Sequence, residues 1–128
     1  MKNTNIAQSY KSSEKGRKQR KFRAFAPFHS KHKLMSSNLS EELRKKYSRR
    51  SFPIIKGDTV RVMNGQFKGQ KGKVLIVNML KLKIYIEGIQ RSKRDGTRVN
   101  VPLDPSNVQI TELKLDDKKR IQSLGKKA

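Results

Sequence analysis

The sequence contains no cysteine, no tryptophan and only two histidines, His29 and His32. Without cysteine there is neither a disulfide framework nor a thiolate zinc site. Two histidines do not make a structural metal site by themselves, so we predict no metal and no cofactor. The longest uninterrupted apolar run has four residues, too short for a membrane-spanning helix or the apolar core of a signal peptide. The 128 residues suffice for one small domain with a modest core.

Acidic residues are also scarce, with 10 Asp and Glu against 32 Lys and Arg, which gives a net charge of +22. A balance this basic indicates a polyanionic partner, and nucleic acid is the usual one. The alternative is a soluble basic protein without such a partner, which the self-repulsion of the charge disfavours. The few acidic residues are scattered, so no acid–base cluster is available for catalysis. We therefore predict no catalytic residues, no enzyme activity and no small-molecule substrate.

Residues 56–88 carry the clearest structural pattern. Val60 and Val62 alternate with polar residues, which is typical of a half-buried strand, and Asn64-Gly65 follows as a turn. Residues 68–73 form a basic loop with two glycines. This loop lacks the strand–loop–helix context and the Lys-Ser/Thr ending of a nucleotide site. Further strands are predicted at 74–77 and 82–87.

Beyond this stretch, Asp95-Gly96 indicates a hairpin turn within a basic loop. A fourth strand follows around Val99 and Val101 and ends at Pro102, because proline cannot donate to a ladder. The fifth covers 108–111. Five short strands so close together predict a mainly β fold, a small SH3-like five-stranded barrel over residues 51–115.

The flanking segments differ from the predicted barrel. Residues 1–25 contain too little apolar surface to fold alone, so we expect a basic disordered arm. Residues 26–50 form a short helical segment, in which one helix opens at Pro27 and a second starts at Ser40. Leu39, Leu43 and Tyr47 give the second helix an apolar stripe that packs on the barrel or on a neighbouring protein. Residues 116–128 form a basic tail, and a short helix ending at Gly125 fits part of it.

The candidate RNA-binding residues are the basic residues of the arm, the helical segment and the loops. The cluster 17–23 reads either as an RNA-penetrating arm, in which an aromatic ring such as Phe22 or Phe25 stacks on an unpaired base, or as a nuclear-import signal. The histidines are interpreted as phosphate or sugar contacts. Lys68, Lys71 and Lys73 are expected to converge on one surface. The full set is Arg17, Lys18, Arg20, Lys21, Arg23, His29, Lys31, His32, Lys33, Arg49, Arg50, Lys68, Lys71, Lys73, Arg91, Lys93, Arg94 and Arg98.

The spacing Gly57-Asp58-x-Val60-x-Val62-x-x-Gly65-x-x-Lys68-Gly69-x-x-Gly72-x-Val74 resembles the KOW motif, which occurs in ribosomal proteins and in NusG/Spt5-type transcription factors. Residues 18–47 and 49–74, in this order, resemble one family more closely. It is the archaeal and eukaryotic form of the KOW-domain protein of the large ribosomal subunit (universal protein twenty-four, the eukaryotic twenty-six family). The resemblance covers roughly residues 17–120, and the helical segment before the barrel favours a eukaryotic source.

The resemblance implies a structural constituent of the large subunit that binds ribosomal RNA near the exit of the nascent-chain tunnel and supports subunit assembly and translation. The implied partners are large-subunit ribosomal RNA and neighbouring ribosomal proteins, with no membrane and no homo-oligomer. The implied location is the cytoplasmic ribosome, and the nucleolus during assembly in a eukaryote. The alternative is a KOW-type transcription-elongation or other RNA-binding module.

Overall fold

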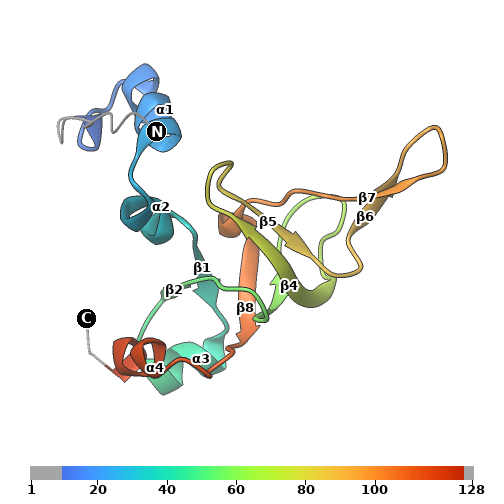
Figure 1. The fold of residues 1–128 in the computed structure, drawn as a ribbon. Helices are drawn as coiled ribbons and strands as arrows, with labels where there is room; N and C mark the ends of the chain where they lie inside the picture. Colours follow the sequence, from blue (N-terminus) through green and yellow to red (C-terminus); the bar gives the residue numbers. More distant parts are fainter. Residues whose placement is uncertain (1–9, 126–128) are drawn as a thin grey trace.

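The computed structural model describes residues 10–125 of the chain. Figure 1 shows a curved sheet with helices at its ends and a long hairpin that projects away from it. Residues in helices and in strands are nearly equal in number. The fold is therefore mixed, and the prediction of a mainly β protein is wrong in this respect. The helices are α1 (Gly16–Phe25), α2 (Phe28–Leu34), α3 (Glu41–Tyr47), α4 (Lys118–Gly125) and the 3-10 turn η2 (Pro105–Asn107).

The strands form one six-stranded sheet in the order β2-β1-β8-β3-β4-β5, and a separate two-stranded hairpin of β6 and β7. Within residues 10–125 no ladder joins the edge strands β5 and β2, and one isolated bridge pairs Ile84 of β5 with Leu103, so the predicted five-stranded barrel is not shown closed. The strands are β1 (Ser36–Leu39), β2 (Ser51–Pro53), β3 (Thr59–Val62), β4 (Lys71–Asn78), β5 (Lys83–Ile86), β6 (Gln90–Ser92), β7 (Arg98–Asn100) and β8 (Val108–Glu112).

All five predicted strands are present, as β3, β4, β5, β7 and β8. Strand β4 begins at Lys71, however, inside the stretch predicted as a loop. Gly72 explains why the strand can extend there. A Cβ atom at this position would lie 2.6 Å from the Glu87 carbonyl oxygen and 2.8 Å from Ile86 Cγ2. Only glycine therefore allows β4 to approach the end of β5 this closely.

Strands β1, β2 and β6 are not among the predicted strands, and β1 was missed because Ser36-Ser37-Asn38 reads as a break. In the structure β1 runs parallel to β8 and antiparallel to β2. The Ser37 side chain is buried, and its hydroxyl donates to the Pro105 carbonyl oxygen at 2.6 Å. Tertiary pairing thus overrides a local sequence that favours turns.

The hydrophobic core is formed by alternate residues of the sheet strands together with Ile89 of the connection from β5 to β6. Val60 and Val62, whose alternation predicted a half-buried strand, are buried, and so are Ile84 and Ile86 of β5. Leu43 and Tyr47 of α3 pack against the same core, which confirms that the stripe has a structural role. The core consists of Met35, Leu39, Phe52, Ile54, Val60, Val62, Val74, Leu82, Ile84, Ile86, Ile89, Val108, Ile110 and Leu124.

The two predicted helices of the helical segment are confirmed as α2 and α3. Pro27 precedes the first turn of α2. Ser40 is the N-cap of α3, and its hydroxyl accepts from the Leu43 backbone N–H at 3.4 Å. Two glutamates in the first turn and three basic residues in the last follow the direction of the helix dipole.

Helix α1 differs from the expectation of a disordered arm over residues 1–25, of which residues 1–9 lie outside the described part of the chain. The segment has no buried residue, so apolar periodicity gave no sign of it. It is nevertheless rich in Arg, Lys, Gln and Ala, all strong helix formers. The Gln19 side chain also donates to the carbonyl oxygens of Lys11 and Ser13, which holds the preceding segment against the helix.

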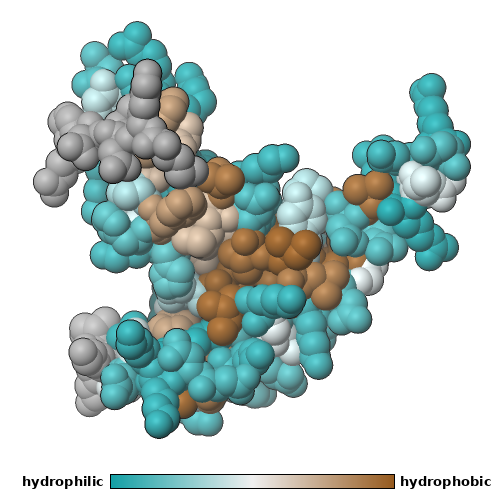
Figure 2. Space-filling model, viewed as in Figure 1, coloured by the Kyte–Doolittle hydropathy of each residue, from teal (hydrophilic) through white to brown (hydrophobic). Residues whose placement is uncertain are grey.

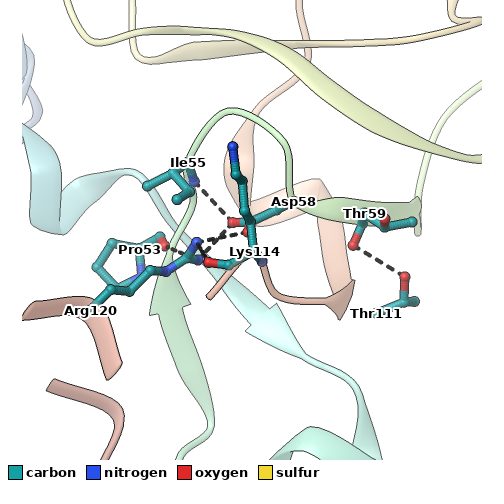
Figure 3. Close-up of polar contacts among 7 residues, drawn as sticks. All are labelled: Pro53, Ile55, Asp58, Thr59, Thr111, Lys114 and Arg120. Atoms are coloured by element: carbon teal, nitrogen blue, oxygen red, sulfur yellow. Dashed lines mark hydrogen bonds and ion pairs between the residues drawn. The ribbon is translucent and has the colours of Figure 1, made fainter. Parts of the chain in front are cut away.

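The C-terminal helix α4 is fixed to the sheet by a buried ion pair between Asp58 and Arg120 (Figure 3). Asp58 is 0 % exposed and Arg120 7 % exposed. The Arg120 guanidinium donates to both carboxylate oxygens, at 2.8 Å to Oδ1 and 2.7 Å to Oδ2. This two-pronged geometry is the strongest form of a charged hydrogen bond between side chains. We call this pair the Asp58–Arg120 clamp.

Backbone groups complete the clamp. The carboxylate also accepts from the backbone N–H groups of Ile55 and Lys114, at 3.0 and 2.9 Å. The guanidinium donates to the carbonyl oxygens of Lys114 and Pro53 and lies 5.4 Å from the centroid of the Phe52 ring. The clamp therefore connects β2, the turn before β3, the segment that follows β8, and α4 (Figure 3). The short helix predicted to end at Gly125 within the basic tail is confirmed as α4, and the clamp docks it on the sheet.

Candidate nucleic-acid interface

Most of the predicted contact residues reach solvent. Lys18 and Arg49 are half-buried, and Lys31 is buried. The structure distributes the exposed ones over the sheet, the hairpin and the N-terminal helices. The exposed residues are Arg17, Arg20, Lys21, Arg23, His29, His32, Lys33, Arg50, Lys68, Lys71, Lys73, Arg91, Lys93, Arg94 and Arg98.

The first group lies on the outer side of β3 and β4. Lys71 and Lys73 flank Gly72 and therefore point to the same side of β4, away from the core. Arg61 of β3 is exposed directly opposite Lys71 in the antiparallel register. Lys68 lies in the turn that joins the two strands. We call Arg61, Lys68, Lys71 and Lys73 the basic sheet face.

Arg61 was missed because its position in the sequence shows only that it alternates with buried valines. Its neighbours become known only when β3 and β4 are paired. Across the ladder, the Cβ atoms of directly opposed residues lie about 5 Å apart. Arg61 and Lys71 thus extend two positively charged side chains from neighbouring positions of the ladder, and an anion bound between them would relieve their repulsion.

The second group occupies the β6–β7 hairpin, which projects from the sheet (Figure 1). Residues 90–99 are exposed throughout, and Arg91, Lys93, Arg94 and Arg98 line the ribbon. We call these four residues the basic hairpin. An open hollow of about 510 Å³ lies along the hairpin, bounded by Arg91, Arg94 and Pro102 among others.

Asp95 shapes the tip of this hairpin. Its carboxylate accepts from the Thr97 hydroxyl at 2.7 Å and from the Thr97 backbone N–H at 3.0 Å. These two bonds, first that of the hydroxyl and then that of the backbone, lower the pKa of the Asp95 carboxyl below its ordinary value. Gly96 takes a φ of 84°, as the predicted Asp-Gly turn requires. The turn thus holds the basic residues on both sides of it in a defined ribbon.

The third group belongs to α1 and α2. Arg17, Arg20, Lys21 and Arg23 are exposed along α1, whereas Lys31 of α2 is a correction to the predicted set. Lys31 is only 3 % exposed, and its ammonium group donates to the Ala24 carbonyl oxygen at 2.8 Å. It therefore joins the end of α1 to α2 and does not face a ligand. The exposed His29 and His32 stay in the set.

A further basic hollow of about 490 Å³ lies at the end of α3, between Arg44, Ser48, Arg49 and Arg50. Arg44 was not predicted, and its Nε donates to the Leu39 carbonyl oxygen at 2.8 Å. The Arg49 guanidinium lies 5.9 Å from the centroid of the Phe52 ring. The left-handed residue Ser48 ends α3 and turns the chain so that the arginines on both sides of it line one hollow.

The ion pairs of the described residues leave the basic sheet face and the basic hairpin uncompensated. They join Lys45 with Glu41, Lys83 with Asp104, Lys114 with Asp116, and Arg120 with Asp58. Each involves a cation outside these two surfaces. Uncompensated positive surfaces attract polyanions and accelerate their association.

Neither a metal-binding cluster nor a membrane-spanning helix is found among the described residues. Among residues 10–125, no group of three or more His, Cys, Asp or Glu could hold a metal ion. The helices in that range are too short and too polar to cross a membrane. The most buried carboxylate, Asp58, is fully occupied by the clamp.

Known proteins of similar sequence identify the family of this chain. Three curated archaeal relatives carry the name large ribosomal subunit protein uL24. The protein of Methanosphaera stadtmanae is 42 % identical over 90 % of this chain and 98 % of its own length. That of Methanoculleus marisnigri is 48 % identical over 88 % and 93 %, and that of Korarchaeum cryptofilum 48 % identical over 90 % and 88 %. The eukaryotic source suggested by the sequence stays a prediction.

A family model that describes the eukaryotic ribosomal proteins L26 together with their archaeal counterparts matches residues 13–127. The match includes the helical segment as well as the KOW stretch, so the ribosomal interpretation prevails over the transcription-elongation alternative. With this coverage and the identity to the curated relatives, the chain belongs to the ribosomal protein family that unites eukaryotic L26 with archaeal uL24.

Proposed function

We propose that this protein is a structural constituent of the large ribosomal subunit and binds ribosomal RNA through its basic surfaces. The family supports the ribosomal role, because the relatives are named as large-subunit proteins. The observation that carries the RNA contact is the basic sheet face. Arg61, Lys71 and Lys73 project from paired strands to one side, opposite to the core.

The architecture suits RNA of irregular fold. The sheet is a rigid base, since its inward residues are fully packed, and it presents cations at fixed spacing to backbone phosphates. The basic hairpin and the N-terminal helices extend away from that base on different sides of the molecule (Figure 1). They reach phosphates that a flat surface would miss. Binding is structural and not catalytic, as the ribosomal family implies.

The family resemblance extends the proposal to the location, the partners and the copy number of the protein. The protein lies near the exit of the nascent-chain tunnel, contacts neighbouring ribosomal proteins and acts as a single copy. It supports subunit assembly, which takes place in the nucleolus if the source is eukaryotic. Arg49, Arg50 and the exposed histidines add contacts at the edges of the surfaces.

The test compares a surface variant with a core variant of the full chain. Replacing Lys68, Lys71 and Lys73 with Gln keeps side-chain length and removes charge from exposed positions. Stability should change by no more than about 0.5 kcal/mol. Affinity for purified large-subunit ribosomal RNA should fall, and the slope of log K against log salt should decrease by about one unit per lost phosphate contact.

Val62→Ala is the matched control, because Val62 is buried in the strand that carries Arg61. It should lower stability by about 1–3 kcal/mol and leave the salt slope of the folded molecules unchanged. Thermal melts and salt-dependent binding distinguish the two variants. A lysine variant that melts far lower but binds RNA with an unchanged salt slope would refute the proposed binding face.

A further inference from the structure

The corner between α1 and α2 exposes two aromatic rings that nothing in the described part of this chain covers. Phe25 is the last residue of α1 and Phe28 the first of α2. They are 56 % and 52 % exposed, whereas Phe22, one turn earlier, is half-buried. Figure 2 shows brown and tan atoms between the teal surfaces where these helices lie. We call Phe25 and Phe28 the aromatic corner.

The corner is held in a fixed shape. The buried Lys31 ammonium donates to the Ala24 carbonyl oxygen at 2.8 Å, so a positive charge caps the C-terminal end of α1. Ala26 is buried, and its backbone N–H donates to the Phe22 carbonyl oxygen at 2.8 Å. The Lys31 backbone N–H donates to the Pro27 carbonyl oxygen at 3.0 Å. The Lys31–Ala24 bond joins the two helices, and the two backbone bonds order the end of α1 and the first turn of α2, so the exposure of the two rings is built into the fold.

Positive charge adjoins the corner along α1. Lys18, Lys21 and Phe25 are spaced three and four residues apart, which puts them on one face of the helix. The ammonium groups of Lys18 and Lys21 lie 5.6 and 5.3 Å from the centroid of the Tyr10 ring. The face thus runs from one aromatic ring, across two cations, to the aromatic corner.

The chemistry of this face selects its occupant. Residues 16–34, which include both helices, contain no Asp or Glu. A protein partner with an ordinary mixed surface would meet unbalanced positive charge around the rings. An RNA strand offers a flat π-surface for each ring and phosphates for the cations, and stacking of bases on aromatic side chains is a general mode of single-strand binding.

We propose that the aromatic corner stacks on unpaired bases of RNA while the cations of α1 hold the adjacent backbone. The inference rests on the proposed function and deepens it, because it assigns base contacts to Phe25 and Phe28 and backbone contacts to the basic surfaces. Stacking accepts any base, and purines offer the larger surface. The corner would therefore favour single-stranded adenines over a duplex, in which the base faces are covered.

The test uses the full chain with two probes, a short single-stranded oligoadenylate RNA and an abasic ribose-phosphate oligomer of the same length. The variant Phe25→Leu/Phe28→Leu keeps apolar side chains and removes both rings. The variant Phe25→Tyr/Phe28→Tyr keeps the rings. Leu80→Ala is the control, since Leu80 is an apolar side chain of similar exposure, 63 %, on the β4–β5 connection.

The leucine variant should bind oligoadenylate about 5-fold or more weaker than the unmodified chain, the effect expected for losing base–aromatic stacking. It should bind the abasic oligomer as well as the unmodified chain, with the same salt slope. The tyrosine variant and Leu80→Ala should bind both probes normally.

Two results would overturn the inference. Unchanged oligoadenylate binding by the leucine variant would mean that the corner serves another partner, such as a protein. An equal loss on both probes would mean that the rings act through the backbone contacts or the fold. If the unmodified chain binds both probes with a steep salt dependence in either case, the proposed function stands and only the stacking role fails.

Discussion

The Asp58–Arg120 clamp gives the sharpest prediction about stability. Asp58→Asn keeps the shape of the side chain but removes its charge, which leaves the Arg120 guanidinium buried at 7 % exposure without a counter-charge. Removing one partner of a buried ion pair costs about 3–5 kcal/mol. The amide also has only one oxygen for the backbone donors of Ile55 and Lys114, so we expect the upper part of this range. A domain this small has about 5–15 kcal/mol in total.

The other half of the clamp should behave differently. Arg120→Met retains an apolar side chain on the Phe52 ring, and the Asp58 carboxylate still accepts from the backbone N–H groups of Ile55 and Lys114. Its cost should therefore lie below that of Asp58→Asn. The double variant should lose less than the sum of the two single variants, because it leaves no charge of the pair buried and unpaired. Glu41→Gln is the control, since it breaks the exposed Lys45–Glu41 pair at a cost of about 0.3–0.5 kcal/mol.

Urea unfolding followed by far-UV circular dichroism measures these differences. With a slope of about 2 kcal/mol per molar, a loss of about 4 kcal/mol lowers the midpoint by about 2 M. Hydrogen exchange on Lys118–Gly125 then shows whether α4 detaches first, since Arg120 and Leu124 are its buried residues. Equal midpoint shifts for Asp58→Asn and Glu41→Gln would refute the reasoning, because the clamp would then contribute no more than a surface pair.

Two further predictions concern the glycine of β4 and the tip of the hairpin. Gly72→Ala should lower stability by about 1–3 kcal/mol in a thermal melt, because the new Cβ would overlap the Glu87 carbonyl oxygen. Gly125→Ala should not lower stability, because the space around Gly125 is open. Equal melting temperatures for the two variants would contradict the packing argument. Because the pKa of Asp95 is lowered, its carboxylate stays ionised and keeps its bonds to Thr97 while the pH falls through the ordinary Asp range. The bonds are lost only as the pH falls through the lowered pKa. The Thr97 amide shift in NMR should titrate below the ordinary Asp range and should not titrate in Asp95→Asn; titration at the ordinary value would count against the bonds.

Local sequence patterns were sufficient to predict most strands of the sheet and to identify the family. Alternating Val60 and Val62, the Asp95-Gly96 turn and the cap at Ser40 each act within a few residues, so the sequence alone identifies them. The spacing of the KOW glycines carries the family resemblance for a related reason. Gly72 is required by close backbone contact, and Gly65 and Gly69 take φ values of 95° and 88°. Such requirements remain visible in sequence because few residues can meet them.

Helix α1 shows a limit of the pattern that was used. Apolar periodicity detects helices that bury a face, and α1 buries none. The propensity of its Arg, Lys, Gln and Ala residues could have indicated it. The buried Lys31 shows a different limit, because lysine is almost always exposed. Only the approach of α2 to the end of α1 gives its ammonium group a carbonyl partner.

By itself, the sequence determined the charge, the family, the main strands and the absence of cysteine chemistry, because each depends on composition or on neighbours along the chain. The tertiary structure decided which cations share a surface, and it added Arg61 to the basic sheet face through the pairing of β3 with β4. Tertiary contacts also fold Ser36–Leu39 into a strand, and they pair Arg120 with Asp58, which lies 62 residues away in the sequence. These contacts join distant segments, and their free energy comes from burial and hydrogen bonding that no local pattern records.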